Sequence, residues 1–354
     1  MGLYNFVYKI GEKIMKRTTI PAANKRMPAE WEKQRAVLLS FPHEKSDWND
    51  NLNSALSVFV RIAQAIAYKE SVYIICDNTQ KIKDLFCSTN NMSFIELSTN
   101  DTWTRDYGVI SIEENGATKL LDFTFDGWGG KFDAHLDNDV NKALYQKGYF
   151  GNTPMETIDF VLEGGSIESD GVGTILTTSK CLCNQNRNGG LSKKEVEAKL
   201  KEYLGAKRVL WLDHGYIAGD DTDSHIDTLA RFVNKDTIAY VKCDDKDDEH
   251  YEALTMMEEQ LKEFTTIDNK PYNLVALPFT KPKYKDGVRL PATYANFLIT
   301  NYALIYPTYD DEADKIAGDI FKKLFPNLEI IPINCLRLIE QGGSLHCSTM
   351  QIRL

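Results

Sequence analysis

The stretch LEGGSI at residues 162–167 has a counterpart, EQGGSL, at residues 340–345. Each follows an apolar segment with strand character, and each places Gly-Gly-Ser before an apolar residue. Paired glycines permit positive φ angles and close approach of the backbone, so we expect the same bend at both places. A bend used twice indicates repeated units around one centre, to which the end of the chain contributes as well as an internal segment.

A helix followed by a short strand recurs along the chain. Apolar residues spaced as on one face of a helix mark the ranges 52–68, 137–147, 192–203, 249–263 and 311–324, and apolar strands follow at 71–76, 157–162, 207–212, 272–277 and 328–333. Further strands are expected at 119–125 and in a hairpin over 293–307 that turns at Thr300 and Asn301. This repetition favours a closed array of small α/β units, with a doubly wound sheet as the alternative.

Composition narrows the choice of partners. The chain has 354 residues, 43% hydrophobic and 26% charged, with a net charge of −10. The negative charge argues against nucleic acid and anionic membranes, and no apolar run is long enough to span a bilayer. It is compatible with a small cationic substrate and leaves a homo-oligomer open. Residues 1–26 lack the features of a signal peptide, so we expect a poorly ordered extension there and a single domain over 27–354.

The cysteines indicate reduced thiols. There are seven, an odd number, scattered from Cys76 to Cys347. Without a secretion signal, this pattern is typical of a cytosolic protein. Cys181 and Cys183 resemble half of a metal site, but no second pair has ligand spacing, so we expect no metal.

The segment from Asp220 to Val233 carries the densest cluster of polar groups. From His225 onward the residues alternate as on a strand, which would place His225 and Asp227 on one face. The two side chains would then share one space, as a catalytic pair does. A solvated acidic loop that leads into a strand is the alternative.

A second cluster lies at the end of the chain, where His346 and Cys347 are adjacent. If residues 345–349 are extended, these side chains point to opposite sides, and His346 is not the base for Cys347. A distant histidine would then be needed, and His225 is the best candidate. A plain buried thiol is the alternative for Cys347.

Two further candidates for the site are acidic residues. The segment Asp101–Gly108 contains Trp103, Arg105 and Asp106, which fits either an aromatic wall beside a carboxylate that binds a cation or a surface loop held by an ion pair. Glu163 stands at the end of the 157–162 strand, directly before the first pair of glycines.

Taken together, these segments resemble the agmatine deiminases, which are part of the bacterial peptidylarginine deiminase-like, guanidine-modifying family. The matching motifs are Met-Pro-Ala-Glu-Trp (27–31) with Phe-Pro-His (41–43), Trp-Thr-Arg-Asp-Tyr-Gly (103–108), Leu-Glu-Gly-Gly-Ser-Ile (162–167), Asp-Asp-Thr-Asp-Ser-His-Ile-Asp (220–227) and Gly-Gly-Ser-Leu-His-Cys (342–347). They occur in the family's order and span nearly the whole chain. Some members of the family have Gly in place of Ser224.

The resemblance implies a pentein fold, a pseudo-symmetric five-bladed α/β propeller with the active site at its centre. It implies Cys347 as the nucleophile, His225 as the general acid and base, and Glu163 as the group that orients His225. Asp106 and Asp227 would hold the guanidinium. Asp220, Asp223 and Trp103 are candidates for the pocket around the distal amine.

The implied reaction is hydrolysis of agmatine to N-carbamoylputrescine and ammonia through an amidino-cysteine intermediate, in putrescine biosynthesis, without a cofactor. The acidic groups near Cys347 should raise its pKa, so we expect a neutral thiol that ionises when the substrate binds. The alternatives are a peptidylarginine or free-arginine deiminase, a non-enzymatic pentein that binds a partner, and a Cys-His-Glu protease or amidase.

Overall fold

The computed structural model describes residues 24–354. The expectation for residues 1–23 lies outside the described part of the chain. The first strand, β1 (Lys25–Arg26), pairs antiparallel with β5 (Ile110–Glu114). The fold therefore includes residues just before position 27, where we expected the domain to begin.

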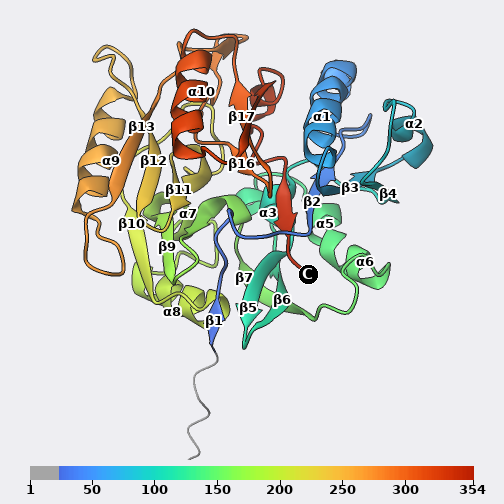
Figure 1. Cartoon of the computed structure of the whole chain (residues 1–354), viewed down its shortest axis with the longest axis horizontal. Helices are drawn as coiled ribbons and strands as arrows, with labels where there is room; N and C mark the ends of the chain where they lie inside the picture. The colour runs from blue at the N-terminus through green and yellow to red at the C-terminus, as the bar shows by residue number, and fades with distance from the viewer. Residues whose placement is uncertain (1–23) are drawn as a thin grey trace, which may run out of the picture.

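The strands form separate small sheets (Figure 1). In spatial order they are β19 (Met350–Ile352), β2 (Ala36–Ser40), β3 (Ser71–Cys76) and β4 (Met92–Glu96); β1, β5, β6 (Ala117–Thr124) and β7 (Met155–Val161); β8 (Ile167–Ser169), β9 (Thr174–Thr178) and β10 (Arg208–Leu212); β11 (Ala230–Asn234), β12 (Thr237–Lys242) and β13 (Asn273–Pro278); and β16 (Leu298–Ile299), β17 (Ala303–Thr308) and β18 (Glu329–Asn334). A short hairpin of β14 (Tyr284–Lys285) and β15 (Val288–Arg289) stands apart from them.

These sheets share one order of pairing. An antiparallel pair is followed by a parallel pair, as in β11–β12 and β12–β13 or in β16–β17 and β17–β18. A helical segment connects each parallel pair, because parallel neighbours need a crossover. The main helices are α1 (Leu52–Ala67), α6 (Val140–Gln146), α8 (Lys193–Leu204), α9 (Tyr251–Glu263) and α10 (Ala313–Leu324).

The remaining helices are short. They are α2 (Thr79–Lys83), α3 (Thr104–Tyr107), α4 (Gly127–Gly130), α5 (His135–Asn138) and α7 (Ser179–Leu182), with 3-10 turns η1 (Asn49–Asn51), η2 (Gly164–Ser166), η3 (Ile226–Thr228) and η4 (Ile339–Gln341). Several of them carry site residues, as described below. Within residues 24–354, no helix combines the length and the apolar character needed to cross a bilayer.

The predicted helices and strands are confirmed because their signals are local. In α1 the buried side chains Leu56, Phe59, Ala63 and Ile66 recur at helical spacing and pack inward. The hairpin predicted over 293–307 is β16–β17, with Ile299 paired to Leu304. The helix predicted over 137–147 is divided into α5 and α6.

The boundaries of α8 follow from its capping residues. Ser192 accepts a hydrogen bond from the backbone of Glu195, and the Glu195 side chain accepts one from the backbone of Ser192. At the other end Gly205 adopts a left-handed conformation with φ of 69°, which favours glycine.

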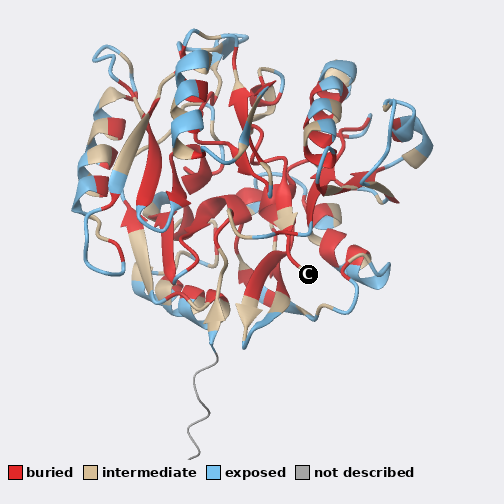
Figure 2. Cartoon of the chain, in the orientation of Figure 1, coloured by how far each residue is buried: buried red, intermediate tan, exposed pale blue. Residues whose placement is uncertain are grey.

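The end of the chain lies beside its beginning. Strand β19 pairs antiparallel with β2, so Met350 is opposite Leu38 and Ile352 is opposite Ala36. This pairing fixes the segment just before β19 in the interior, where the burial colouring of Figure 2 is almost continuous. The outer faces of α9, α10 and α1 are exposed in the same view. Cys347 is therefore delivered to the middle of the molecule by the last strand.

Candidate active site

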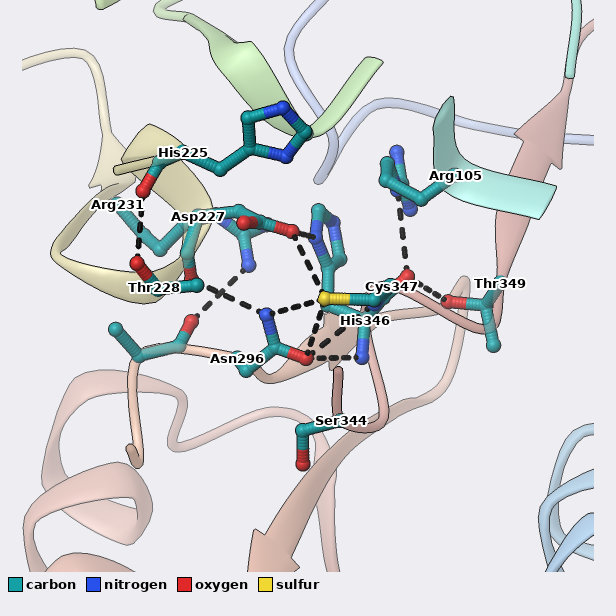
Figure 3. Close-up of polar contacts among 12 residues, drawn as sticks. Arg105, His225, Asp227, Thr228, Arg231, Asn296, Ser344, His346, Cys347 and Thr349 are labelled. Atoms are coloured by element: carbon teal, nitrogen blue, oxygen red, sulfur yellow. Dashed lines mark hydrogen bonds and ion pairs between the residues drawn. The ribbon is translucent and has the colours of Figure 1, made fainter. Parts of the chain in front are cut away.

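His225 and Cys347 line the same cavity, as the sequence-based pairing requires. The cavity has a volume of about 220 Å³. Trp103 and Asp106 also line it, together with residues of the β14–β15 hairpin and of the segment before Cys347. Figure 3 shows Cys347, His225 and their neighbours at the meeting point of several elements. The structure thus brings together residues that are far apart in the sequence.

Cys347 lies in a turn and not in an extended segment, so the expected geometry of residues 345–349 is wrong. Ser348 donates its backbone N–H to Ser344, and Thr349 donates to His346. Within the described residues, His346 nevertheless makes no hydrogen bond to Sγ of Cys347. Its Nδ1 lies 2.8 Å from Oδ2 of Asp227, and its Nε2 lies 2.8 Å from Oε2 of Glu30. Both ring nitrogens are therefore engaged with carboxylates.

Asn296 is a site residue that the sequence analysis missed. Its Nδ2 lies 3.2 Å from Sγ of Cys347, and its Oδ1 accepts hydrogen bonds from the backbone N–H groups of His346 and Cys347. The available signal was an asparagine between Ala295 and Phe297 in an otherwise apolar segment. A buried amide in such a place needs polar partners, and here the partners come from the segment that carries the nucleophile.

His225 precedes the 3-10 turn η3, and the strand β11 begins only at Ala230. The predicted alternation over 225–229 is therefore wrong. Asp223 and Ser224, just before His225, have positive φ angles of 66° and 68°, which are strained for residues other than glycine. This sharp turn, and not a strand, directs the imidazole into the cavity.

The ring of His225 is buried, with 1% of the residue exposed, and neither ring nitrogen has a hydrogen-bond partner among residues 24–354. Nδ1 lies 3.6 Å from Oδ1 of Asp106, and Nε2 lies 4.0 Å from Oε2 of Glu163. Burial lowers the pKa of His225 to about 3, because a buried imidazolium loses hydration. Burial therefore favours the neutral imidazole over the imidazolium.

Asp106 comes from the short helix α3 and is held by two donors. Nε1 of Trp128 donates to Oδ2 at 2.9 Å, and the backbone N–H of Gly165 donates to Oδ1 at 3.0 Å. Trp128 has a φ of 58°, a strained conformation that accompanies its contact with the site. Burial, together with nearby Asp227 and Glu163, raises the pKa of Asp106 well above its usual value.

Gly165 explains why a Gly-Gly pair stands beside the site. A methyl group at this position would lie 2.6 Å from Nδ1 of His225, 2.8 Å from Oδ1 of Asp106 and 3.3 Å from Oδ2 of Asp227. Only Gly342 in the two Gly-Gly-Ser segments has a positive φ. The first pair of glycines therefore serves close approach, and the expectation of the same bend at both places is wrong.

Glu163 and Asp227 lie behind the cavity wall and are fully buried. Nε of Arg187 donates to both oxygens of Glu163, at 2.8 and 3.1 Å. Burial raises the pKa of Glu163, against the effect of Arg187. The pKa of Asp227 is lowered despite burial, chiefly through its contact with His346, whose Nδ1 lies 2.8 Å from Oδ2. Within the described residues, Oδ1 has no hydrogen-bond partner.

The surroundings of Cys347 raise the pKa of its thiol. Its Sγ lies 3.7 Å from Oδ2 of Asp227. Burial is the largest cause of its raised pKa, followed by the charges of Asp227 and Asp106. Burial and these two carboxylates therefore favour the neutral thiol over the thiolate, which is the direction that the sequence leads us to expect.

Of the three residues expected around the distal amine of the substrate, two line the cavity and one does not. Trp103 and Asp220 line the cavity, but Asp223 does not. The carboxylate of Asp223 accepts from Nη1 of Arg187 at 2.6 Å and from Nζ of Lys131 at 2.9 Å. Asp220 accepts hydrogen bonds from Thr222 and Ser224, so both aspartates stabilise the turn that precedes His225.

Two buried groups have the residue types of a metal site. Glu163, Cys181 and His225 form one, and Glu30, Glu168 and His346 form the other. Arginines already bind the carboxylates of both groups, because Arg187 donates to Glu163 and Arg231 binds Glu30 and Glu168. A cation would have to displace these arginines, so neither group is assigned as a metal centre.

Comparison with known proteins places the chain in a family. The Porphyromonas-type peptidyl-arginine deiminase family matches residues 26–352. An agmatine deiminase of Medicago truncatula is 32% identical over 92% of this chain and 95% of its own length. A C. jejuni agmatine deiminase with substrate bound is 41% identical over 99% of both chains, with a TM-score of 0.89. The agmatine deiminase of Enterococcus faecalis is 29% identical over 93% of this chain and 95% of its own, with a TM-score of 0.85. The chain therefore belongs to the Porphyromonas-type peptidyl-arginine deiminase family.

Proposed function

We propose that the chain hydrolyses agmatine to N-carbamoylputrescine and ammonia, a step toward putrescine, on a five-bladed α/β propeller. The shared order of antiparallel and parallel pairs in the five main sheets supports the propeller. The observation that carries the function is the single cavity lined by Cys347, His225 and Asp106, with Asp227 behind it. One sulfur, one imidazole and two carboxylates suit a trapped guanidinium.

In the first step, Sγ of Cys347 attacks the central carbon of the guanidinium. The thiol proton moves to His225, so that a thiolate attacks, since the thiolate is the nucleophile. The bond between carbon and one nitrogen then breaks, and His225 gives its proton to that nitrogen, which leaves as ammonia. The remaining amidino group is cationic and is bound to Cys347 as a thioether.

In the second step, water attacks the amidino carbon while His225 accepts a proton from the water. The carbon–sulfur bond breaks, the thiolate of Cys347 is regenerated, and the ureido product loses its extra proton. One proton restores the thiol, and the other converts ammonia to ammonium. Glu163, 4.0 Å from His225 Nε2, stabilises the imidazolium that forms in both steps.

The positive charge of a bound substrate offsets the effect of the neighbouring carboxylates on Cys347. At 4 Å and an effective dielectric constant of about 20, opposite charges attract by about 4 kcal/mol, or roughly three pKa units. The guanidinium therefore lowers the raised pKa values of Cys347 and Asp106. It lies between Asp106 and Asp227, which hold its nitrogens and fix the direction of attack.

The charge of the cavity favours a dication over arginine. Its acidic lining residues are Asp47, Asp101, Asp106, Asp220, Asp221 and Glu340. Arg289 also lines it, but its guanidinium donates to Asp248 and Glu249. The substrate carboxylate of free arginine would thus meet acids and a cation that is already paired, whereas the distal ammonium of agmatine meets complementary charge.

The direct test is to incubate the purified protein separately with agmatine, arginine and a blocked arginine peptide, and to measure ammonia and ureido product. We expect agmatine to be preferred over arginine by at least roughly 100-fold in kcat/KM, because one unpaired charge in a site costs several kcal/mol. Preference for the peptide would favour peptidylarginine deimination. No product from any of the three would favour a pentein that binds a partner without catalysis.

A further inference from the structure

His346 stands next to Cys347 in the chain, yet its buried imidazole contacts two carboxylates. Figure 3 shows the ring beside Asp227. We propose that His346 is a positioning residue, an imidazolium that donates to Asp227 and Glu30 at once and thereby holds Asp227 as an oriented anion for the guanidinium. The inference deepens the proposed function and rests on it for the role toward the guanidinium. The protonation of the ring is measured without a substrate.

The contacts of the ring determine how many protons it carries. Nδ1 lies 2.8 Å from Oδ2 of Asp227, and Nε2 lies 2.8 Å from Oε2 of Glu30. A neutral imidazole has one donor and one acceptor, an imidazolium has two donors, and an ionised carboxylate only accepts. Between two ionised carboxylates, therefore, only the imidazolium makes both hydrogen bonds. A neutral ring would need a proton on one of the two carboxyl groups.

Glu30 is bound as an ionised carboxylate. The backbone N–H of Ile299 donates to Oε1 at 2.7 Å, and Nη2 of Arg231 donates to Oε2 at 2.8 Å, the same oxygen that faces His346. Nη2 of Arg105 lies 3.9 Å from this oxygen. Burial raises the pKa of Glu30, but the neighbouring cations, Arg231 foremost, lower it below its usual value. Both oxygens of Glu30 therefore face donors.

Asp227 uses one oxygen for the protein and leaves the other free. Oδ2 faces His346 and lies 3.7 Å from Sγ of Cys347. Oδ1 has no hydrogen-bond partner in the described part of the chain, although Asp227 is fully buried. A buried acceptor without a partner is costly, and an N–H of the guanidinium would satisfy it. The contact with His346 therefore determines which oxygen remains for the substrate.

The other charged groups close to the ring are two guanidiniums and a third carboxylate, from Arg105, Arg231 and Glu168. Burial and the guanidiniums lower the pKa of His346, whereas its two carboxylate partners raise it. Glu168 accepts from Arg231 and, among residues 24–354, makes no hydrogen bond to the ring. The geometry decides between these influences, because each ring nitrogen lies within hydrogen-bond distance of an acceptor.

His250 shows what a neutral buried ring looks like in the same molecule. Its Nδ1 lies 2.7 Å from Oδ1 of Asp248, much as Nδ1 of His346 lies beside Asp227. Its Nε2, however, accepts from the backbone N–H of Ala218 at 2.8 Å. This ring needs one donor and one acceptor, which the neutral imidazole provides. The two histidines therefore differ in the partner of Nε2, and so in the number of protons.

The charge on His346 keeps Asp227 out of proton transfer. Asp106 also faces Asp227, and repulsion between these carboxylates favours a proton on one of them. The pKa of Asp227 is lowered despite burial, chiefly through His346, so the proton is not on Asp227. Asp227 is then a poor base for the nearby thiol of Cys347, and the thiol proton goes to His225. No proton passes through His346, so the balance of the reaction is unchanged.

Nitrogen NMR tests the protonation of the ring directly. The protein, without substrate, is labelled with nitrogen-15 in the rings of its six histidines. We expect one ring to keep two protonated nitrogens at pH 8, although the ordinary pKa of histidine is about 6.5. The variant His346→Asn should remove this signal, and His250→Asn should leave it in place. The absence of any doubly protonated ring in the unsubstituted protein at pH 8 would overturn the proposal, whatever the substrate is.

The kinetics of the same two variants test the positioning of Asp227. Asparagine can place an N–H near the position of Nδ1, so His346→Asn keeps a donor to Asp227 but loses the positive charge. The pKa of Asp227 then rises, and its protonation removes activity as the pH falls. We expect the loss of kcat/KM for agmatine in His346→Asn to be about tenfold greater at pH 6 than at pH 9.

The matched control, His250→Asn, replaces another buried histidine beside an aspartate, and its loss of kcat/KM should be the same at both pH values. A loss in His346→Asn that is equal at pH 6 and pH 9 would indicate packing alone and would overturn the positioning role. If agmatine is not turned over, the proposed function fails, and the NMR signal still decides whether His346 is an imidazolium.

Discussion

The two reacting groups are held in opposite ways. Cys347 is fixed in a turn, with Asn296 at 3.2 Å and Asp227 at 3.7 Å from its sulfur. His225 is equally buried, yet in the described part of the chain both of its ring nitrogens lack a hydrogen-bond partner, and its acidic neighbours lie 3.6 and 4.0 Å away. The nucleophile is thus prepared before the substrate arrives, whereas the imidazole stays free to receive and return a proton. Residues on one side of the cavity therefore position the nucleophile, and His225 on the other side transfers protons.

The largest loss of activity is expected when the nucleophile, Cys347, is replaced. Replacing Cys347 with serine removes the nucleophile, and we expect kcat for agmatine to fall by about 10⁴-fold or more. Binding should persist, because the acidic groups remain. Ammonia release measures the first expectation and calorimetric titration with agmatine the second. Turnover by Cys347→Ser at a tenth of the original rate would break the assignment of the nucleophile.

The next largest loss of activity is expected when His225 is replaced. The variant His225→Asn lacks the group that shuttles protons, so kcat should fall by about 10²- to 10⁴-fold. The alkylation of Cys347 in the absence of substrate should change far less, because His225 makes no hydrogen bond to the sulfur in the described structure. Equal losses in alkylation and turnover would instead show that the two sides act as a preformed ion pair.

The variant Glu163→Gln tests the role of the carboxylate that lies beside His225. In Glu163→Gln, Arg187 loses a buried carboxylate partner, which typically costs about 3–5 kcal/mol of the free energy of unfolding. Urea unfolding measures this loss. Since the imidazolium of His225 also loses a stabilising charge, kcat should fall while KM changes little. An unchanged midpoint of unfolding would contradict the buried pair with Arg187.

A further test measures the protons that the acidic residues of the cavity release when the substrate binds. Two acidic residues that line the cavity have pKa values raised by burial, to about 6 for Asp101 and for Asp220. A bound dication lowers these values, so protons leave as agmatine binds. The release should be larger at pH 6 than at pH 8, because Asp101 and Asp220 are already ionised at the higher pH. Titration calorimetry of Cys347→Ser in buffers of different ionisation enthalpy measures it, and net proton uptake at pH 6 would have the wrong sign.

The smallest effect is expected in the turn before His225. Ser224 has a φ of 68°, and its buried hydroxyl finds no hydrogen-bond partner in the region that the structure describes. Glycine relieves the strain of a left-handed residue, about 1–2 kcal/mol, at a cost in chain entropy of about 0.5–1 kcal/mol. Ser224→Gly should therefore raise the free energy of unfolding by up to about 1 kcal/mol. A loss of stability on chemical unfolding would show that the turn needs the serine.

Much of the fold was predictable because its signals are local. The buried stripe of α1 and the apolar run of β3 are continuous in the sequence, and both elements lie where periodicity places them. The alternation after His225 was misleading, since the strained Asp223 and Ser224 start a turn that shifts the strand to Ala230. The long-range contacts give no local signal.

The same distinction holds for the site. Cys347 and His225 were found because their motifs are rich in reactive groups, and the structure places both in one cavity. Asn296 and Arg187 were missed because their partners are 51 and 24 residues away along the chain. Asp223 was a candidate for the pocket around the distal amine, but Arg187 and Lys131 bind its carboxylate, and these partners are 36 and 92 residues away along the chain.

The central claim is that Cys347 and His225 act on one trapped guanidinium through a covalent intermediate. The most direct measurement is mass spectrometry of the protein quenched with acid during turnover of agmatine. The account predicts that the C-terminal peptide containing Cys347 gains the mass of agmatine less that of ammonia, and that the same peptide stays unmodified in Cys347→Ser. Ammonia formation with no adduct on Cys347, under conditions in which His225→Gln also leaves the peptide bare, would contradict it.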